Sequence, residues 1–360
     1  MIRAKLIKER RSCGRGEGSG AKVMEEKGGG EQNLVHKEDA EPRNSSIFFW
    51  KICFSRFAIK KNPTVSLSSS HRSAPLLFLF NMASFVEKLS PEALAYFNEV
   101  AAKPFSQQAV HFLNAYWPEV GDQAEFIFTV GWEVIKYADM HCKGVSLIYL
   151  YDEGNDLDFN IGLYFYEKLC HFVEDPKNRQ WTEAKYARSQ PEMMTALKRK
   201  TELREKVDVN FDGRVSFLEY LLYQYRDCCN PAEFCQRSMA GGDEHPEIRK
   251  ARLALEEVNK RIRAYEAEKA RLEAEALKPG VPGLRAKNLL AQLDSSPLAE
   301  ELNKALITAE AAVRIATRKF GGAGGGGAGA AGGHFAPTEG AIWWMNRDLE
   351  EKQKRYGGRK

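Results

Sequence analysis

Residues 208–219 read DVNFDGRVSFLE, and the oxygen-bearing side chains of this stretch follow a defined spacing. They occupy positions 1, 3, 5, 9 and 12, which are Asp208, Asn210, Asp212, Ser216 and Glu219. Gly213 stands at position 6, where a twelve-residue loop must turn sharply, and Arg214 at position 7 can offer its backbone carbonyl. An EF-hand loop supplies oxygens to Ca²⁺ from these positions, so we predict a calcium site here. The alternative is an acidic surface turn that binds nothing.

The composition predicts a globular protein of about two domains. The chain has 360 residues, of which 43% are apolar and 28% charged, enough apolar residues to form a packed core. Its net charge of +4 is uneven, because residues 1–81 carry 15 Lys and Arg against 8 Asp and Glu. The remaining residues are close to neutral, with both signs mixed, which argues against a nucleic-acid partner.

The cysteines indicate a reducing compartment. All seven are scattered, and no two form a CxxC pair. The neighbours His141-Cys142 and Cys170-His171 match no common zinc spacing, so we expect them to pack in the core.

The sequence supports neither a membrane-spanning protein nor an enzyme. No apolar run approaches the roughly 18–20 residues that span a bilayer, and no apolar signal core follows the basic N-terminus. We therefore expect a cytoplasmic protein without a membrane partner. Phosphate loops, HExxH and dinucleotide fingerprints are absent too, so we do not expect an enzyme.

The first 81 residues differ from the rest of the chain. They are rich in Gly, Ser, Lys and Arg and show no sustained periodicity. We predict that residues 1–81 are disordered or a non-native extension, and that the protein proper starts at Met82. If the segment is native, its aromatic and basic stretch Phe48–Lys61 could touch a membrane.

Helix signals dominate from Met82 onward and predict a mostly α fold. A helical domain containing the EF-hand is expected over residues 82–240, with Ser90-Pro91 capping its first helix. Further helices are expected over 106–117, 122–142, 191–207 and 217–227. The apolar run Val145–Tyr151 could be strand or helix.

A second stretch resembles an EF-hand loop imperfectly. Residues 156–167 carry oxygen ligands at positions 1, 3, 5 and 12, which are Asp156, Asp158, Asn160 and Glu167. Position 6 is Ile161 where glycine is expected, so we predict a degenerate partner loop. The alternative is the start of a helix, with Asp158 as its cap.

A second helical region follows Gly241-Gly242. Apolar residues recur at heptad spacing over about 246–277 and at helical spacing over 297–320. We predict a coiled-coil-like helical hairpin domain over residues 246–320, followed by a Gly/Ala linker over 321–333. The tail 334–360 contains Trp343-Trp344, which must dock on this chain or on a partner.

Several longer strings resemble the calcium-regulated 34 kDa actin-bundling protein family of amoeboid cells. They include PFSQQAVHFLNAYW at 104–117, YADMHCKG at 137–144, HPEIRKARLALEEVNKRIRAYEAEK at 245–269 and AIWWMNRDLEEKQKRY at 341–356. The resemblance covers nearly all of residues 85–360 and none of residues 1–81.

This resemblance implies a monomer that crosslinks filamentous actin and is weakened by Ca²⁺ bound at the loop 208–219. It also implies that the protein is located in the cytoplasm and the actin cytoskeleton, in the cell cortex and protrusions. Filamentous actin is acidic, so basic side chains are the expected contacts. Our candidates are Lys198, Arg199, Lys200, Arg249, Lys250, Arg252, Lys260, Arg261 and Arg263. The rival hypothesis is a calcium sensor or adaptor that binds a target helix without crosslinking actin.

Overall fold

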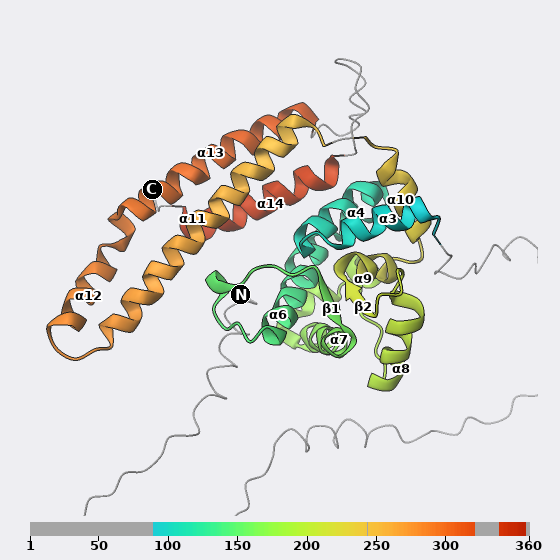
Figure 1. Ribbon diagram of the computed structural model, residues 1–360, viewed down its shortest axis with the longest axis horizontal. Helices are drawn as coiled ribbons and strands as arrows, with labels where there is room; N and C mark the ends of the chain where they lie inside the picture. Colours follow the sequence, from blue (N-terminus) through green and yellow to red (C-terminus); the bar gives the residue numbers. More distant parts are fainter. Residues whose placement is uncertain (1–88, 243, 321–337, 358–360) are drawn as a thin grey trace, which may run out of the picture. The chain divides into compact units, whose positions relative to one another are not determined.

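The computed structural model describes residues 89–242, 244–320 and 338–357, all of which belong to one contact unit (Figure 1). The predictions for residues 1–81 and for the linker 321–333 lie outside these ranges. The mostly α fold is confirmed, since one two-stranded sheet is the only sheet among the described residues. None of the described helices is long and apolar enough to cross a bilayer.

The N-terminal part, up to Met239, consists of short helices around one small sheet. In chain order its elements are α3 Pro91–Ala101, α4 Phe105–Val120, η1 Gly121–Gln123, α5 Ala124–Phe126, η2 Ile127–Trp132, α6 Glu133–Cys142, η3 Ile148–Leu150, β1 Asp156–Asp158, α7 Phe159–Glu174, η4 Pro176–Thr182, η5 Ala184–Ser189, α8 Ala196–Glu202, η6 Leu203–Val207, β2 Arg214–Ser216, α9 Phe217–Gln224 and α10 Pro231–Met239.

These helices enclose a core rich in aromatic side chains, which we call the N-terminal core. Its largest fully buried members include Phe97, Phe112, Phe217 and Tyr225. Phe112 of α4 stacks on Tyr225 with ring centroids 5.8 Å apart, so α4 is joined to the end of α9. Burial of large apolar side chains stabilises this region.

The C-terminal part consists of long helices, α11 Pro246–Ala276, α12 Val281–Ala291, η7 Leu293–Ser295 and α13 Pro297–Phe320. Helices α11 and α13 lie side by side (Figure 1). They are antiparallel, because Glu247 near the start of α11 pairs with Lys319 near the end of α13. Apolar side chains between them form a second cluster, the C-terminal core.

Helix α14 (Glu339–Tyr356) contacts both cores. Trp344 is buried in the N-terminal core, whereas Ile342, Met345 and Leu349 belong to the C-terminal core. Ile342, Met345 and Leu349 are three and four residues apart, so they share one face of α14. Trp344 lies on the adjacent face of the same helix. The tail segment thus packs on this chain.

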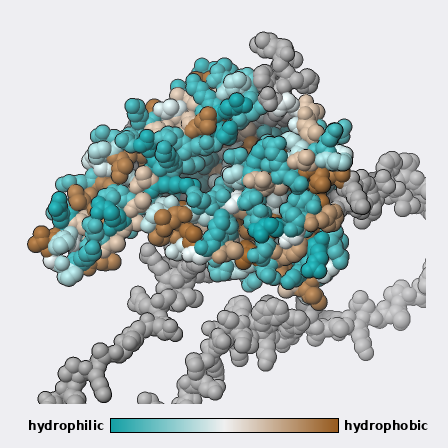
Figure 2. Space-filling model, viewed as in Figure 1, coloured by the Kyte–Doolittle hydropathy of each residue, from teal (hydrophilic) through white to brown (hydrophobic). Residues whose placement is uncertain are grey.

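The surface is largely hydrophilic (Figure 2). Hydrophobic side chains gather where α11 turns into α12, and Leu277, Val281 and Leu284 are exposed there. Exposed apolar groups of this kind often mark protein contacts.

Some predicted helix boundaries are wrong. The helix expected over 106–117 begins at Phe105 and continues to Val120, with Pro118 inside it. The chain tolerates Pro118 because the backbone already departs from helical angles at Tyr116, with φ −127° and ψ 27°. The undecided run Val145–Tyr151 contains only the 3₁₀ turn Ile148–Leu150.

Candidate functional site

The loop 208–219 connects η6 to α9 through a single turn. Gly213 adopts φ 79° with no atom near its missing Cβ, and Phe211 also has a positive φ of 59°. Ser216 then caps α9, accepting a hydrogen bond from the Glu219 amide, while the Glu219 carboxylate accepts from the Ser216 amide. This capping box satisfies amides at the helix start that would otherwise lack partners.

Two carboxylates of this loop are buried. Asp208 is 3% and Glu219 1% exposed. One Glu219 oxygen accepts from the Val209 amide at 2.8 Å and the other from the amide and hydroxyl of Ser216 at 2.8 and 2.9 Å. Burial, assisted by the Asp208 charge, still raises the Glu219 pKa to about 8.

One buried carboxylate oxygen of this loop has no hydrogen-bond partner. Asp208 Oδ2 accepts from the Gly213 amide at 3.0 Å, but Asp208 Oδ1 is buried without a hydrogen-bond partner. A buried carboxylate oxygen left unpaired is costly, and a divalent cation would compensate for it. The residues present therefore fit a hard oxygen-seeking ion such as Ca²⁺.

The side-chain oxygens of Asn210 and Asp212 accept hydrogen bonds from backbone amides of the same loop. Asp212 Oδ1 accepts from the Arg214 amide at 2.8 Å, and Asn210 Oδ1 accepts from the Asp212 amide at 3.2 Å. Within the described residues no three acidic, histidine or cysteine side chains form a metal-binding group.

The predicted partner loop 156–167 is wrong in its register. Asp156–Asp158 forms β1, which pairs antiparallel with β2, and Leu157 faces Val215. Val215 is position 8 of the loop 208–219, which we call the calcium loop after its predicted ligand. A loop with Leu157 at its own position 8 spans residues 150–161. This segment, the partner loop from here on, has Ile161 at position 12, where Glu219 stands in the calcium loop.

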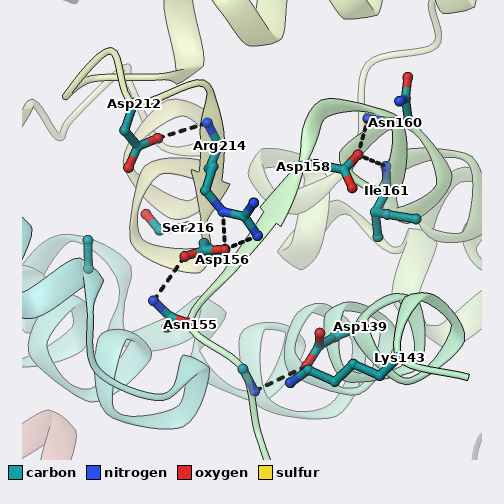
Figure 3. Close-up of polar contacts among 12 residues, drawn as sticks. Asp139, Lys143, Asn155, Asp156, Asp158, Asn160, Ile161, Asp212, Arg214 and Ser216 are labelled. Atoms are coloured by element: carbon teal, nitrogen blue, oxygen red, sulfur yellow. Dashed lines mark hydrogen bonds and ion pairs between the residues drawn. The ribbon is translucent and has the colours of Figure 1, made fainter. Parts of the chain in front are cut away.

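The structure instead has the alternative that we considered for residues 156–167, the start of a helix. Asp158 caps α7, accepting from the amides of Asn160 and Ile161 at 2.8 and 3.1 Å (Figure 3). Glu167 lies two turns along the same helix, where its carboxylate is 3.7 Å from the His171 ring. A helical backbone cannot wrap these side chains around one ion, because they project from different turns.

Acidic side chains of the partner loop are paired with arginines. The Arg214 guanidinium of the calcium loop binds Asp156, which also accepts from Asn155 Nδ2 at 2.9 Å (Figure 3). Arg263 of α11 binds Asp152 at 2.7 Å. These guanidinium groups supply positive charge beside a loop that lacks the position-12 carboxylate.

A buried glutamine connects the two loops, and sequence reasoning missed it. Gln108 of α4 is fully buried, and its Nε2 donates to the Asn155 carbonyl of the partner loop at 2.7 Å. Its Oε1 accepts from the Leu218 amide at the start of α9 at 2.9 Å. The only signal was a polar residue on the apolar side of a predicted helix, beside Phe105 and Phe112.

The basic candidates on α8 differ in exposure. Lys198 is exposed, and Lys200 donates to Asn160 Oδ1 at 3.2 Å. The expectation that Arg199 is exposed is wrong, because it is 5% exposed, pairs with Glu202 and lies 4.1 Å from the Tyr166 ring centroid. Arg199 therefore holds α8 to the core and is not available as a surface contact.

The candidate arginines of α11 are joined to carboxylates. Arg252 binds Glu244 and Glu256, Arg261 binds Glu257 and Glu301, and Arg249 lies 3.5 Å from Glu244. Lys250 and Lys260 are exposed. Exposed ion pairs contribute little stability, so these arginines can exchange partners.

The double tryptophan of α14 docks on the N-terminal core. Trp344 meets the Phe128 ring edge to face at 4.8 Å and the Trp132 ring at 5.2 Å. Arg347, one turn later, makes a bidentate pair with Glu125 at 2.9–3.0 Å. These contacts come from segments more than 200 residues apart in the sequence.

Comparisons with known proteins converge on one group. Residues 216–324 match the family model described as F actin bundling C terminal. The calcium-regulated actin-bundling protein of Dictyostelium discoideum is 71% identical over 279 residues, covering 77% of this chain and 93% of that protein. The crystal structure of the 34 kDa F-actin bundling protein from the same organism is similar with a TM-score of 0.70 and 68% identity, covering 76% of this chain and all of that one. Both proteins are named for actin bundling and not for a catalytic activity.

Proposed function

The chain belongs to the calcium-regulated actin-bundling protein family, and we propose that it crosslinks actin filaments into bundles. The observation that carries this proposal is the 71% identity to a protein named for that activity. The calcium loop, with its buried unpaired Asp208 oxygen, supports regulation by Ca²⁺. When bound, Ca²⁺ would be held by Asp208, Asn210, Asp212, Ser216, Glu219 and the Arg214 carbonyl, where it would supply charge and draw the loop together.

A crosslinker needs two filament-binding surfaces. One is α8 with the exposed Lys198 and the half-buried Lys200, whose positive charge suits an acidic filament. The other is α11, where Lys250 and Lys260 are exposed and the paired arginines Arg249, Arg252, Arg261 and Arg263 can exchange their partners for acidic groups of actin.

Two domains, 82–240 and 246–320, would carry these two surfaces. Their separate hydrophobic cores support this division, and α14 contacts both. We expect Ca²⁺ to move the helices that flank the loop 208–219, and Asp152–Arg263 and α14 to pass that movement to the C-terminal helices. Bundling would then weaken, because the two surfaces are no longer presented together.

Filamentous actin is the proposed partner, without nucleic acid or membrane. We propose a monomer in the cytoplasm and actin cytoskeleton, in the cortex and protrusions. The sensor or adaptor hypothesis is not favoured, because the relatives are named for bundling.

Low-speed sedimentation of actin filaments with this protein, with and without Ca²⁺, tests the proposal. Bundles should sediment without Ca²⁺ and decrease when it is added. A sensor that does not crosslink would leave the filaments in the supernatant under both conditions, and that result would overturn the proposal.

A further inference from the structure

Asn98 lies outside the calcium loop but bonds to one of its ligands. Asn98 is on α3, more than 100 residues before the loop, and its Oδ1 accepts from Asn210 Nδ2 at 3.0 Å. Asn210 stands at position 3, where the side-chain oxygen is the ligand. A contact that orients this amide therefore bears directly on the position of a ligand atom.

The amide of Asn210 is held in one orientation by three bonds. Its Nδ2 donates to Asn98 Oδ1 and to Asp212 Oδ2, the latter at 2.9 Å, and its Oδ1 accepts from the Asp212 amide. A flip of the amide would place its NH₂ group against the Asp212 amide and its oxygen against two acceptors. The donor side of Asn210 must therefore face Asn98.

The two acceptors of Asn210 differ in what calcium would do to them. The Asp212 carboxylate is itself a ligand at position 5, so it must turn towards the ion when the loop closes. The Asn98 oxygen is outside the ligand set and keeps its place. After loop closure, Asn98 is thus the acceptor that remains for the Asn210 amide hydrogens.

Helix α3 is a firm support for such a contact. The neighbouring Phe97 is fully buried and meets the Phe234 ring of α10 edge to face at 6.4 Å. Val100 is fully buried as well, and Ser90 caps the helix through the Ala93 amide. Since side chains on both sides of Asn98 are locked in the core, its position does not depend on the loop.

We propose that Asn98 is a positioning residue for the calcium site, which directs the Asn210 side-chain oxygen towards the ion. This inference rests on the proposed calcium site at 208–219. Outer partners of metal ligands commonly tune affinity in this way, because they reduce the rotational freedom that a ligand must lose on binding.

Calorimetric titration of the full chain with Ca²⁺ tests this role. Asn98→Ala should raise the Kd about three- to tenfold, the effect of losing one hydrogen bond. Asn98→Asp keeps an acceptor and should bind Ca²⁺ at least as tightly as the wild type. Thermal unfolding without Ca²⁺ should be the same for all three proteins, since Asn98, the residue that is changed, is exposed.

The matched control is the background Asn210→Asp. Aspartate also serves at position 3 but has no amide hydrogen to give to Asn98 Oδ1, so Asn98→Ala should weaken calcium binding less in this background than in the wild type. An unchanged Kd for Asn98→Ala alone, or an equal loss in both backgrounds, would overturn the role of Asn98. A wild-type chain that takes up no Ca²⁺ would instead overturn the calcium site itself, and the Asn98 role with it.

Discussion

Leu157 and Val215 face each other across the antiparallel pair β1–β2, and both are 2% exposed. Val215 is position 8 of the calcium loop, so this pairing places Leu157 at position 8 of the partner loop 150–161. The two loops are then related residue by residue: Ser216 caps α9 as Asp158 caps α7, and Glu219 corresponds to Ile161. The two loops are joined by one antiparallel strand pair, but only the calcium loop has a carboxylate at position 12.

Glu219→Gln should abolish calcium binding, whereas Glu167→Gln should not change it. The first variant removes the carboxylate that can bind the ion through two oxygens, and the second alters an exposed glutamate on α7. Calorimetry should give one Ca²⁺ per chain for the wild type and Glu167→Gln and none for Glu219→Gln. In the sedimentation assay, only Glu219→Gln should bundle equally with and without Ca²⁺; loss of binding in Glu167→Gln would contradict the revised register.

Arg199→Ala should destabilise the protein by about 3–5 kcal/mol, the range for breaking a buried ion pair. The variant leaves the Glu202 carboxylate buried with Tyr223 as its remaining partner. Lys198→Ala, one residue away and exposed, is the control and should stay within about 0.5 kcal/mol of the wild type. Urea denaturation measures both, and equal effects would show that Arg199 is not held as the structure has it.

Trp344→Ala should cost about 3–5 kcal/mol of stability, because it leaves a cavity between Phe128 and Trp132. Trp343→Ala should cost less, since Trp343 is only partly buried. The order can be read from the midpoints of chemical denaturation. The reverse order would mean that α14 docks in another orientation.

His111 should make the protein less stable as the pH falls below about 6.5. Burial and the Lys103 ammonium, 3.3 Å away, lower its pKa to about 4, while Glu244 and Glu99 oppose this and Arg252 assists it. The unfolded chain then binds a proton between about pH 6.5 and 4 that the folded chain does not, so stability is lost as the pH falls through this window. The slope is at most about 1.4 kcal/mol per pH unit.

Urea denaturation at pH 7, 6 and 5 checks this prediction against His111→Gln. The difference between the two proteins should shrink or reverse as the pH falls, because glutamine takes up no proton. Parallel curves would show that His111 is not the group responsible.

The helical content was predictable because its signals are local. Ser90-Pro91 starts α3 as expected, and the spacing of apolar residues along 246–277 and 297–320 predicted α11 and α13 closely. The end of α4 was predicted wrongly because Pro118 was expected to stop the helix. The helix accommodates Pro118 through the non-helical angles at Tyr116, and these depend on tertiary contacts. One such contact is the bond from the Tyr116 hydroxyl to the Asn230 carbonyl at 2.9 Å.

The spacing of the residues alone predicts a calcium site at 208–219, since all the candidate ligands lie within twelve consecutive residues and their spacing is a local property. The register of the partner loop follows from the folded chain and not from the sequence, because a strand pair is set by the residues that meet across it and not by either strand alone. The same holds for Arg199, whose burial depends on Tyr166, and for Asn98 and Gln108, which reach the calcium site from helices distant in the chain. Spacing along one segment carries no information about which other segment folds against it.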